Sequence, residues 1–312
     1  MIRRVLAWSG AVVLLLALLA VAAALQLEWQ ARRAARDGAA RLAAVERSSA
    51  RPGAPVTGTP VLILLHGAGL NAHMWDPVRR HLDPTLRVIA LDLPGHGARR
   101  DVDYSLDGAT ADVLLTARSV ASEPVILVGD SLGGYTAMAA APLLPRGQLV
   151  GLVLAGSSGN IGATGAARML AQSAFVRALT LVSAEGKLAA RALDRFGVAG
   201  ADAQAIVAAG VNFGAIAPAG RSLAGVDFRA RLAAVDVPVL IINGSLDSNA
   251  MAQEASFLAA ARQGTSLHFE NCEHGVSMRR PAEFAAAMNA FAHRVTRAPG
   301  SARDASQSAL SP

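Results

Sequence analysis

The chain has 312 residues, a formal net charge of +6 and a single cysteine, Cys272. This length allows one large domain or a domain with an inserted subdomain, because the buried fraction of the surface rises with chain length. One cysteine excludes an internal disulfide. The positive charge comes from scattered arginines, Lys187 being the only lysine, and no aromatic residues are interleaved with them. We therefore expect no nucleic-acid partner.

The first segment of the chain is apolar. Residues 5–27, 23 in number, carry no charged side chain and follow two arginines. At 1.5 Å per residue, a helix of this length is long enough to cross a bilayer. We expect residues 1–27 to be a retained single-pass anchor, typical of a bacterial inner-membrane protein. Small residues near its end, Ala22 and Ala24, leave a cleaved signal segment and an exported form open.

Residues 28–58 are predicted to form a juxtamembrane helix followed by a linker, because 51–60 contain three prolines and two glycines. The side of the membrane stays open. Five arginines on this side of the apolar run outnumber the two before it, which favours keeping the catalytic part in the cytoplasm. They are Arg32, Arg33, Arg36, Arg41 and Arg47.

Residues 59–296 alternate short apolar runs with helical patterns, which predicts an α/β domain. The runs are continuously hydrophobic, so each strand is expected to be buried on both faces, in a mainly parallel sheet of six to eight strands flanked by helices. Strands are predicted at 61–65, 86–91, 125–128, 149–154, 237–242 and 266–269, and helices at 76–82, 106–121, 132–144, 250–262 and 282–294.

The stretch at about 157–232 carries helical patterns and no convincing strand, so it is predicted to be a helical lid inserted between two strands. Its segment 166–182 places five large apolar residues at helical spacing, typical of core packing or of an acyl-binding wall. These are Met169, Leu170, Phe175, Val176 and Leu179. The tail, 297–312, is expected to be disordered.

A G-x-S-x-G motif spans Gly129 to Gly133, directly after a predicted strand and before a predicted helix. A serine at the tip of such a turn, here Ser131, has a strained backbone that exposes its hydroxyl. Small residues two positions to either side let the neighbouring chain pass. This context predicts a nucleophilic serine.

Together, GDSLGG at 129–134, HGAG at 66–69 and DLPGHG at 92–97 resemble the α/β-hydrolase superfamily over residues 60–295. The combination is specific to that fold and not to a substrate. Two antiparallel strands usually precede the HG-containing strand in this family. Here the linker before Val61 is too short for them, so we expect the sheet to have lost one or both.

The resemblance implies an acid and a histidine after the serine in chain order. Asp247 lies just past the predicted strand 237–242, and His274 follows the predicted strand 266–269. Asp247 has an alternative interpretation as a helix N-cap. His66 and His96 lie within the family motifs and are expected to shape their loops.

In the implied mechanism, His274 takes the proton of Ser131, and Asp247 orients the imidazole. The family pattern places the oxyanion donors at the backbone amides of Ala68 and Leu132. The sequence shows no metal-ligand spacing, phosphate loop or nicotinamide fingerprint, so no cofactor and no metal are expected.

These residues predict a serine hydrolase that cleaves a carboxylic ester, or a related acyl bond, of an apolar small molecule. Two alternatives stay open. One is a carbon–carbon bond hydrolase of the same superfamily, which would act on vinylogous diketones rather than on simple aryl esters. The other is a non-catalytic binding protein built on a hydrolase frame.

Overall fold

The computed structural model describes residues 2–48, 58–180 and 185–297. Most of the predicted linker, at 49–57, and the predicted disordered tail, at 298–312, lie outside the described residues.

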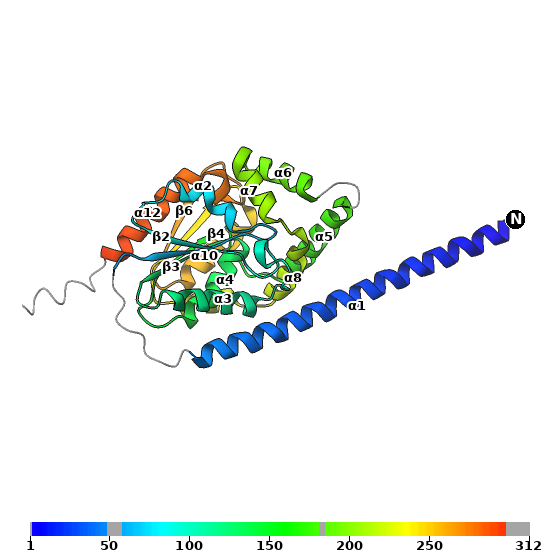
Figure 1. Ribbon diagram of the computed structural model, residues 1–312, viewed down its shortest axis with the longest axis horizontal. Coiled ribbons are helices and arrows are strands. Elements are labelled where there is room, and N and C mark those ends of the chain that lie inside the picture. The colour runs from blue at the N-terminus through cyan, green and yellow to red at the C-terminus, as the bar shows by residue number, and fades with distance from the viewer. Residues whose placement is uncertain (1, 49–57, 181–184, 298–312) are drawn as a thin grey trace, which may run out of the picture.

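Six strands form one sheet with the order β2-β1-β3-β4-β5-β6, and every strand pair is parallel. The fold is the predicted α/β class (Figure 1). No antiparallel strand precedes β1 within the described residues, in line with the expected loss. The strands are β1 Val61–Leu65, β2 Arg87–Leu91, β3 Val125–Asp130, β4 Leu149–Ala155, β5 Val239–Gly244 and β6 Gly264–Phe269.

Helices cover both faces of the sheet, which is why its central strands are apolar throughout. In β1, Val61, Ile63 and Leu65 belong to the hydrophobic core on one face, and Leu62 and Leu64 to the core on the other. The first core is closed by α3 Leu106–Ser119, α4 Leu132–Ala140, α9 Phe228–Ala233 and α10 Ser248–Ala260, and the second by α2 Asp76–Arg79 and α12 Pro281–Arg297.

Short helical turns complete the connections between strands and helices. In parallel strands the carboxyl ends meet at one edge of the sheet, and ligands bind there in open α/β folds. The loops after β1, β3, β4, β5 and β6 all begin at this edge. The turns are η1 Ala72–Trp75, η2 Gly97–Arg99, η3 Ala141–Leu143 and α11 Val276–Arg279.

Between β4 and β5 the described chain is helical, with no strand, in the region where a lid is predicted. Figure 1 shows α5 and α6 on the side of the folded domain opposite α12. The helices are α5 Ala163–Thr180, α6 Glu185–Arg195, α7 Gly200–Ala209, η4 Phe213–Ala215 and α8 Ile216–Leu223, followed by α9.

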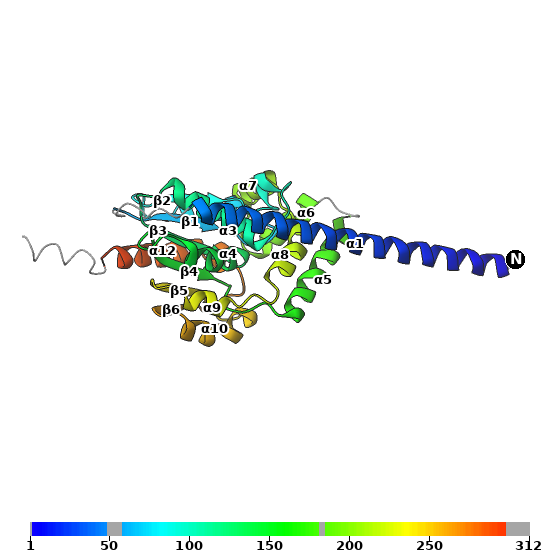
Figure 2. The ribbon, with the colours of Figure 1, turned by 90° about the horizontal axis from the view of Figure 1, so that it is seen from below.

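Helix α1, Ile2–Ser48, is continuous across residue 27, where the sequence suggests a boundary. Its second half packs on α3, and its first half extends away from the domain (Figures 1 and 2). The two helices can approach closely because Gly38 has no side chain. A Cβ on Gly38 would lie only 2.8 Å from the amide nitrogen of Gly108. Arg41 forms an ion pair with Asp112 at 2.5 Å. The docked half of α1 is therefore part of the folded domain.

A test for membrane-spanning helices in the described residues identifies no single helix that is long and apolar enough. Only the bent pair Gly200–Ala209 and Phe213–Leu223 passes it, by length and composition.

Candidate active site

Ser131 lies at the turn between β3 and α4 with φ 51° and ψ −111°, a conformation that non-glycine residues rarely adopt. The turn is held from both sides. The Ser131 amide donates to the carbonyl of Ala155 at 2.7 Å, and the Ser131 carbonyl accepts from the amide of Gly134 at 3.0 Å. The predicted strained turn is thus present, and its hydroxyl-bearing residue lines a large cavity.

The glycines around Ser131 are required by close packing. A Cβ on Gly129 would collide with the backbone of Gly133, and a Cβ on Gly133 would collide with the carbonyl of Leu65 at the end of β1. Only glycine lets α4 start this close to β1 and β3. The spacing of the motif therefore has a steric cause in this fold.

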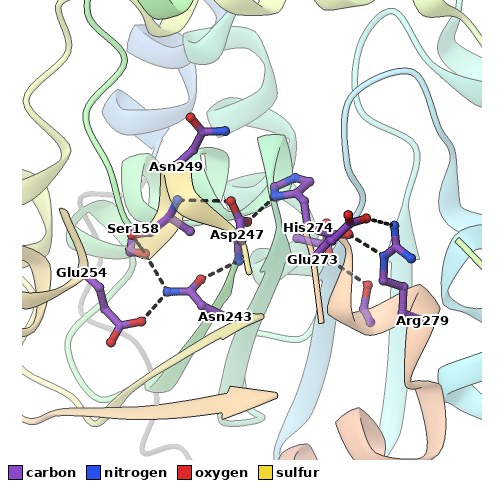
Figure 3. Close-up of polar contacts among 12 residues, drawn as sticks. Ser158, Asn243, Asp247, Asn249, Glu254, Glu273, His274 and Arg279 are labelled. Carbon is purple, nitrogen blue, oxygen red and sulfur yellow. Dashed lines mark hydrogen bonds and ion pairs between the residues drawn. The ribbon is translucent and has the colours of Figure 1, made fainter. Parts of the chain in front are cut away.

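His274 and Asp247 form a close pair. Nδ1 of His274 lies 2.6 Å from Oδ2 of Asp247 (Figure 3). Asp247 follows β5 and is almost fully buried, whereas 45% of the His274 side chain is exposed. The other carboxylate oxygen of Asp247 accepts from the amide of Ala250 at 3.2 Å, at the start of α10. Asp247 thus caps a helix and is also hydrogen-bonded to an imidazole.

The surroundings of these two side chains favour an ionised Asp247 and a protonated His274. Burial alone would raise the pKa of Asp247, but the hydrogen bond and charge of His274 and the amides of Ala250 and Asn249 hold it below its usual range. Burial alone would lower the pKa of His274, but the hydrogen bond to Asp247 and the charges of Asp130 and Asp247 raise it. His274 is therefore a stronger base than a free imidazole.

The amides of Ala68 and Leu132 both belong to residues that line the cavity beside Ser131. Leu132 is the first residue of α4, where a helix has no acceptor of its own for an N–H group. No described residue accepts from the amide of Ala68. The amides on either side are engaged, Gly67 with Met74 Sδ at 3.3 Å and Gly69 with His96 Nε2 at 2.9 Å. The two donors are thus available to a ligand.

His66 and His96 lock the loop that carries Ala68. Nε2 of His66 accepts from the amide of Leu93 at 3.0 Å, and Nε2 of His96 accepts from that of Gly69. Each Nδ1 lies against a backbone carbonyl, so both rings are neutral donor–acceptor bridges. Burial lowers the pKa of His66 to about 4 and that of His96 to about 3. They shape their loops, as the sequence suggests.

Comparison with known proteins matches residues 62–287 to the alpha/beta hydrolase family. The chain belongs to the alpha/beta hydrolase family. It is 31% identical over 251 residues to a pimeloyl-[acyl-carrier protein] methyl ester esterase of Edwardsiella ictaluri, which covers 74% of this chain and 92% of the relative. It is 43% identical to an esterase of Mycobacterium tuberculosis over 97 residues, 29% of this chain and 32% of that protein.

Among solved structures, the chain resembles a hydrolase from Pseudomonas aeruginosa with a TM-score of 0.61 and 26% identity. The match covers 75% of this chain and 89% of the other. Family membership and these relatives identify the chain as a hydrolytic enzyme with the α/β-hydrolase fold.

The hydrolase also contains a buried polar network that sequence reasoning missed. Asn243, in β5, donates to Glu254 at 2.5 Å and to Ser158 at 2.8 Å (Figure 3), and its carbonyl oxygen accepts from the amide of Gly156 at 3.2 Å. A Cβ on Gly156 would lie 2.7 Å from Cε1 of His274. The network therefore fixes the turn on which the imidazole rests. Its members lie up to 98 positions apart, so no local pattern signals it.

A second missed contact joins Asp130, beside the nucleophile, to Ser277, three residues after His274. The Ser277 hydroxyl donates to Asp130 Oδ2 at 2.6 Å, and both residues are buried. The only signal in the sequence is the position of Asp130 within the motif.

The cavity above the carboxyl edge of the sheet in the hydrolase has a volume of about 1190 Å³ and is lined by Ser131, Asp247 and His274. The lid helices form the opposite wall. Of the five lid residues singled out in the sequence, Met169, Phe175, Val176 and Leu179 line the cavity. Phe175 is 65% exposed, whereas Met169 packs against the hydrophobic core, so the cavity-facing side of α5 is only partly packed.

Proposed function

We propose that the protein hydrolyses carboxylic esters with Ser131 as the nucleophile, His274 as the general base and Asp247 as its orienting acid. The supporting observation is the 2.6 Å pair of His274 and Asp247 in the wall of the cavity that Ser131 also lines. The named activity of the similar proteins from Edwardsiella ictaluri and Mycobacterium tuberculosis is that of an esterase.

In this mechanism Asp247 accepts a hydrogen bond from Nδ1 of His274, which leaves Nε2 as the base. Nε2 removes the Ser131 proton while the serine oxygen attacks the ester carbonyl. The amides of Ala68 and Leu132 stabilise the oxyanion, and each such donor is typically worth about 10² to 10³ in rate. His274 then protonates the leaving alcohol, and water repeats the sequence on the acyl-serine.

The apolar lining that the lid helices contribute to the cavity favours a substrate whose acyl group is apolar along its length. Besides the four α5 side chains named above, four further apolar residues line the cavity: Leu188, Phe196, Phe213 and Leu223. Three arginines also line it, all with exposed side chains: Arg168, Arg191 and Arg195. None forms an ion pair with a described acidic residue, and among the described residues that line the cavity the carboxylates are Asp130 and Asp247. A substrate with an anionic end would match this lining.

We also propose that residues 5–27 anchor the enzyme in a bilayer. The support is the length of the uncharged run in the sequence and its position in the half of α1 that extends away from the catalytic domain.

Ester hydrolysis and serine labelling test the proposal. We expect the wild type to hydrolyse p-nitrophenyl esters and to react with a fluorophosphonate probe, and Ser131→Ala to lose both. Ser122→Ala, which removes an exposed serine on the surface, is the matched control. Labelling that persists in Ser131→Ala would contradict the assignment. Turnover of a vinylogous diketone without ester hydrolysis would favour a carbon–carbon bond hydrolase. A wild type that the probe does not label would favour a non-catalytic binding protein.

A further inference from the structure

The residue before the proposed nucleophile, Asp130, is a buried acid. Asp130 ends β3, is 3% exposed, and lines the same cavity as Ser131 and His274. A buried carboxylate needs compensation by hydrogen bonds or opposite charge. Asp130 has one hydrogen bond from a side chain, the 2.6 Å contact with the fully buried hydroxyl of Ser277.

Ser277 connects Asp130 to the loop that carries His274. It lies in α11, whose first turn is tied to this loop by the amides of Met278 and Arg279, both of which donate to the carbonyl of Gly275 at 3.1 Å. The Arg279 side chain donates to the carbonyl of His274 at 3.0 Å. The nucleophile elbow and the histidine loop are therefore joined through one carboxylate and one hydroxyl.

Three charged groups act on His274. Asp247 is hydrogen-bonded to it and raises its pKa, the negative charge of Asp130 also raises its pKa, and the positive charge of Arg279 lowers it. Asp130 in turn interacts with the charge of His274 and with that of Asp247. Burial, with a further contribution from the charge of Asp247, raises the pKa of Asp130 above its usual range, and the imidazolium and the Ser277 hydroxyl counteract part of this. The charge of Asp130 is thus most stable when His274 is protonated.

We propose that Asp130 is a positioning residue and a second acid partner of His274. Its carboxylate, held by Ser277, stabilises the imidazolium that forms when Ser131 transfers its proton, and its tie to Ser277 holds the histidine loop against the elbow. This inference rests on the proposed function. The proton moves from the Ser131 oxygen to Nε2 of His274 and then to the leaving alkoxide, and no proton is transferred to Asp130.

The Asp130→Asn variant separates charge from shape, because the amide keeps an acceptor for Ser277 and loses the negative charge. We expect the pKa of His274, measured by NMR titration of its Cε1 proton, to fall by about one unit, as for loss of a nearby opposite charge. The resonance is assigned by its absence in His274→Gln. In the pH profile of kcat/KM, the acid limb moves to lower pH by the same amount, and kcat decreases.

Asp236→Asn removes an exposed carboxylate far from the cavity and serves as the control, with no shift expected. If Asp130→Asn does not fold, Ser277→Ala tests the same idea. Loss of the hydroxyl makes the Asp130 charge less stable, so the pKa of His274 falls by a smaller amount. An unchanged His274 pKa in whichever variant folds would overturn the proposal, even if activity decreases. A wild type without esterase activity would refute the proposed function, while the NMR titration would still test Asp130.

Discussion

Gly156 shows how one residue position constrains the orientation of His274, the proposed general base. It follows β4 with φ 59°, and its amide donates to Asn243 of the buried network. A side chain at this position would lie 2.7 Å from Cε1 and 3.0 Å from Nδ1 of His274. The position of the imidazole ring therefore requires a glycine here, in addition to the hydrogen bond to Asp247.

We therefore expect Gly156→Ala to displace the His274 ring and to lower kcat at least about 100-fold, because small misplacements of a catalytic group are costly. The measurement is kcat on a p-nitrophenyl ester, with circular dichroism to check the fold. Gly147→Ala is the matched control, since Gly147 also has positive φ, 84°, but no atom within 4 Å of the added Cβ. Equal losses in both variants would show that backbone strain alone is responsible.

At the residue scale, the five site residues suggested by the sequence each follow a strand end or lie in a family motif, and all of them line one cavity: Ala68, Ser131, Leu132, Asp247 and His274. Their catalytic roles stay a prediction. The sequence did not predict the partners of Asp130 or the Asn243 network. Both depend on side chains that come together only when β3, β5 and α11 pack, and hydrophobic periodicity carries no information on such pairings.

At the scale of elements, the loops after β1 and β2 depend on two neutral histidines. The pKa values of about 4 and 3 for His66 and His96 lie below the ordinary value of 6.5. Between pH 6.5 and pH 4 these histidines bind protons in the unfolded chain but not in the folded one. The free energy of unfolding therefore decreases as the pH falls through this window.

Each histidine contributes a slope of about 1.4 kcal/mol per pH unit in this window. In His96→Gln, whose amide oxygen can still accept from Gly69, we expect a smaller loss of thermal stability between pH 6.5 and 4 than in the wild type. Melting temperatures across this range measure it. His81→Gln, at an exposed histidine outside these loops, is the matched control. An equal slope in His96→Gln would mean that His96 is not held neutral.

The lid helices lead to a prediction about substrate charge. Arg191 and Arg195 lie one turn apart on α6 and line the cavity without an acidic partner among the described residues. We expect the enzyme to prefer the monomethyl ester of a dicarboxylic acid over the corresponding dimethyl ester. The double variant Arg191→Ala/Arg195→Ala should lose about 10-fold in kcat/KM on the charged ester, as for loss of one charge-assisted contact.

The neutral ester should be affected little by this double variant. Arg146→Ala, at an exposed turn away from the cavity, should affect neither substrate. Similar losses on the charged and neutral esters would instead assign the two arginines to the stability of the lid.

Element boundaries show where local patterns are incomplete. Strand β5 begins at Val239 rather than at 237, because Pro238 has no N–H group for the sheet ladder. Strand β6 begins at Gly264, two residues earlier than predicted. It is an edge strand with mostly exposed side chains, so its start lacks the hydrophobic signal of the buried strands.

At the scale of the whole molecule, the α/β class and the parallel sheet were predictable because the four central strands are largely buried runs and helical patterns lie between the strands. The docking of α1 was not. The contact of Gly38 with α3 and the Arg41–Asp112 pair involve residues about 70 positions apart, and a glycine within a helix does not by itself indicate a partner.

The anchor proposal has its test at this scale. We expect the full chain, expressed in bacterial cells, to sediment with membranes, to resist extraction by high salt, and to be released by detergent. A variant without residues 2–27 should remain in the supernatant and keep its esterase activity, because the half of α1 that packs on α3 is retained. The full chain in the soluble fraction would contradict the anchor.

The continuity of α1 has a consequence for the rotational phase of the enzyme. An α-helix turns by about 100° per residue, so one residue inserted between Glu28 and Arg33 would swing the catalytic domain by that angle about the helix axis. Seven inserted residues make nearly two full turns. They would return the domain to within about 20° of its starting direction and move it about 10 Å along the axis. If residues 5–27 anchor the enzyme as proposed, the number of residues in this stretch sets which side of the cavity mouth faces the bilayer.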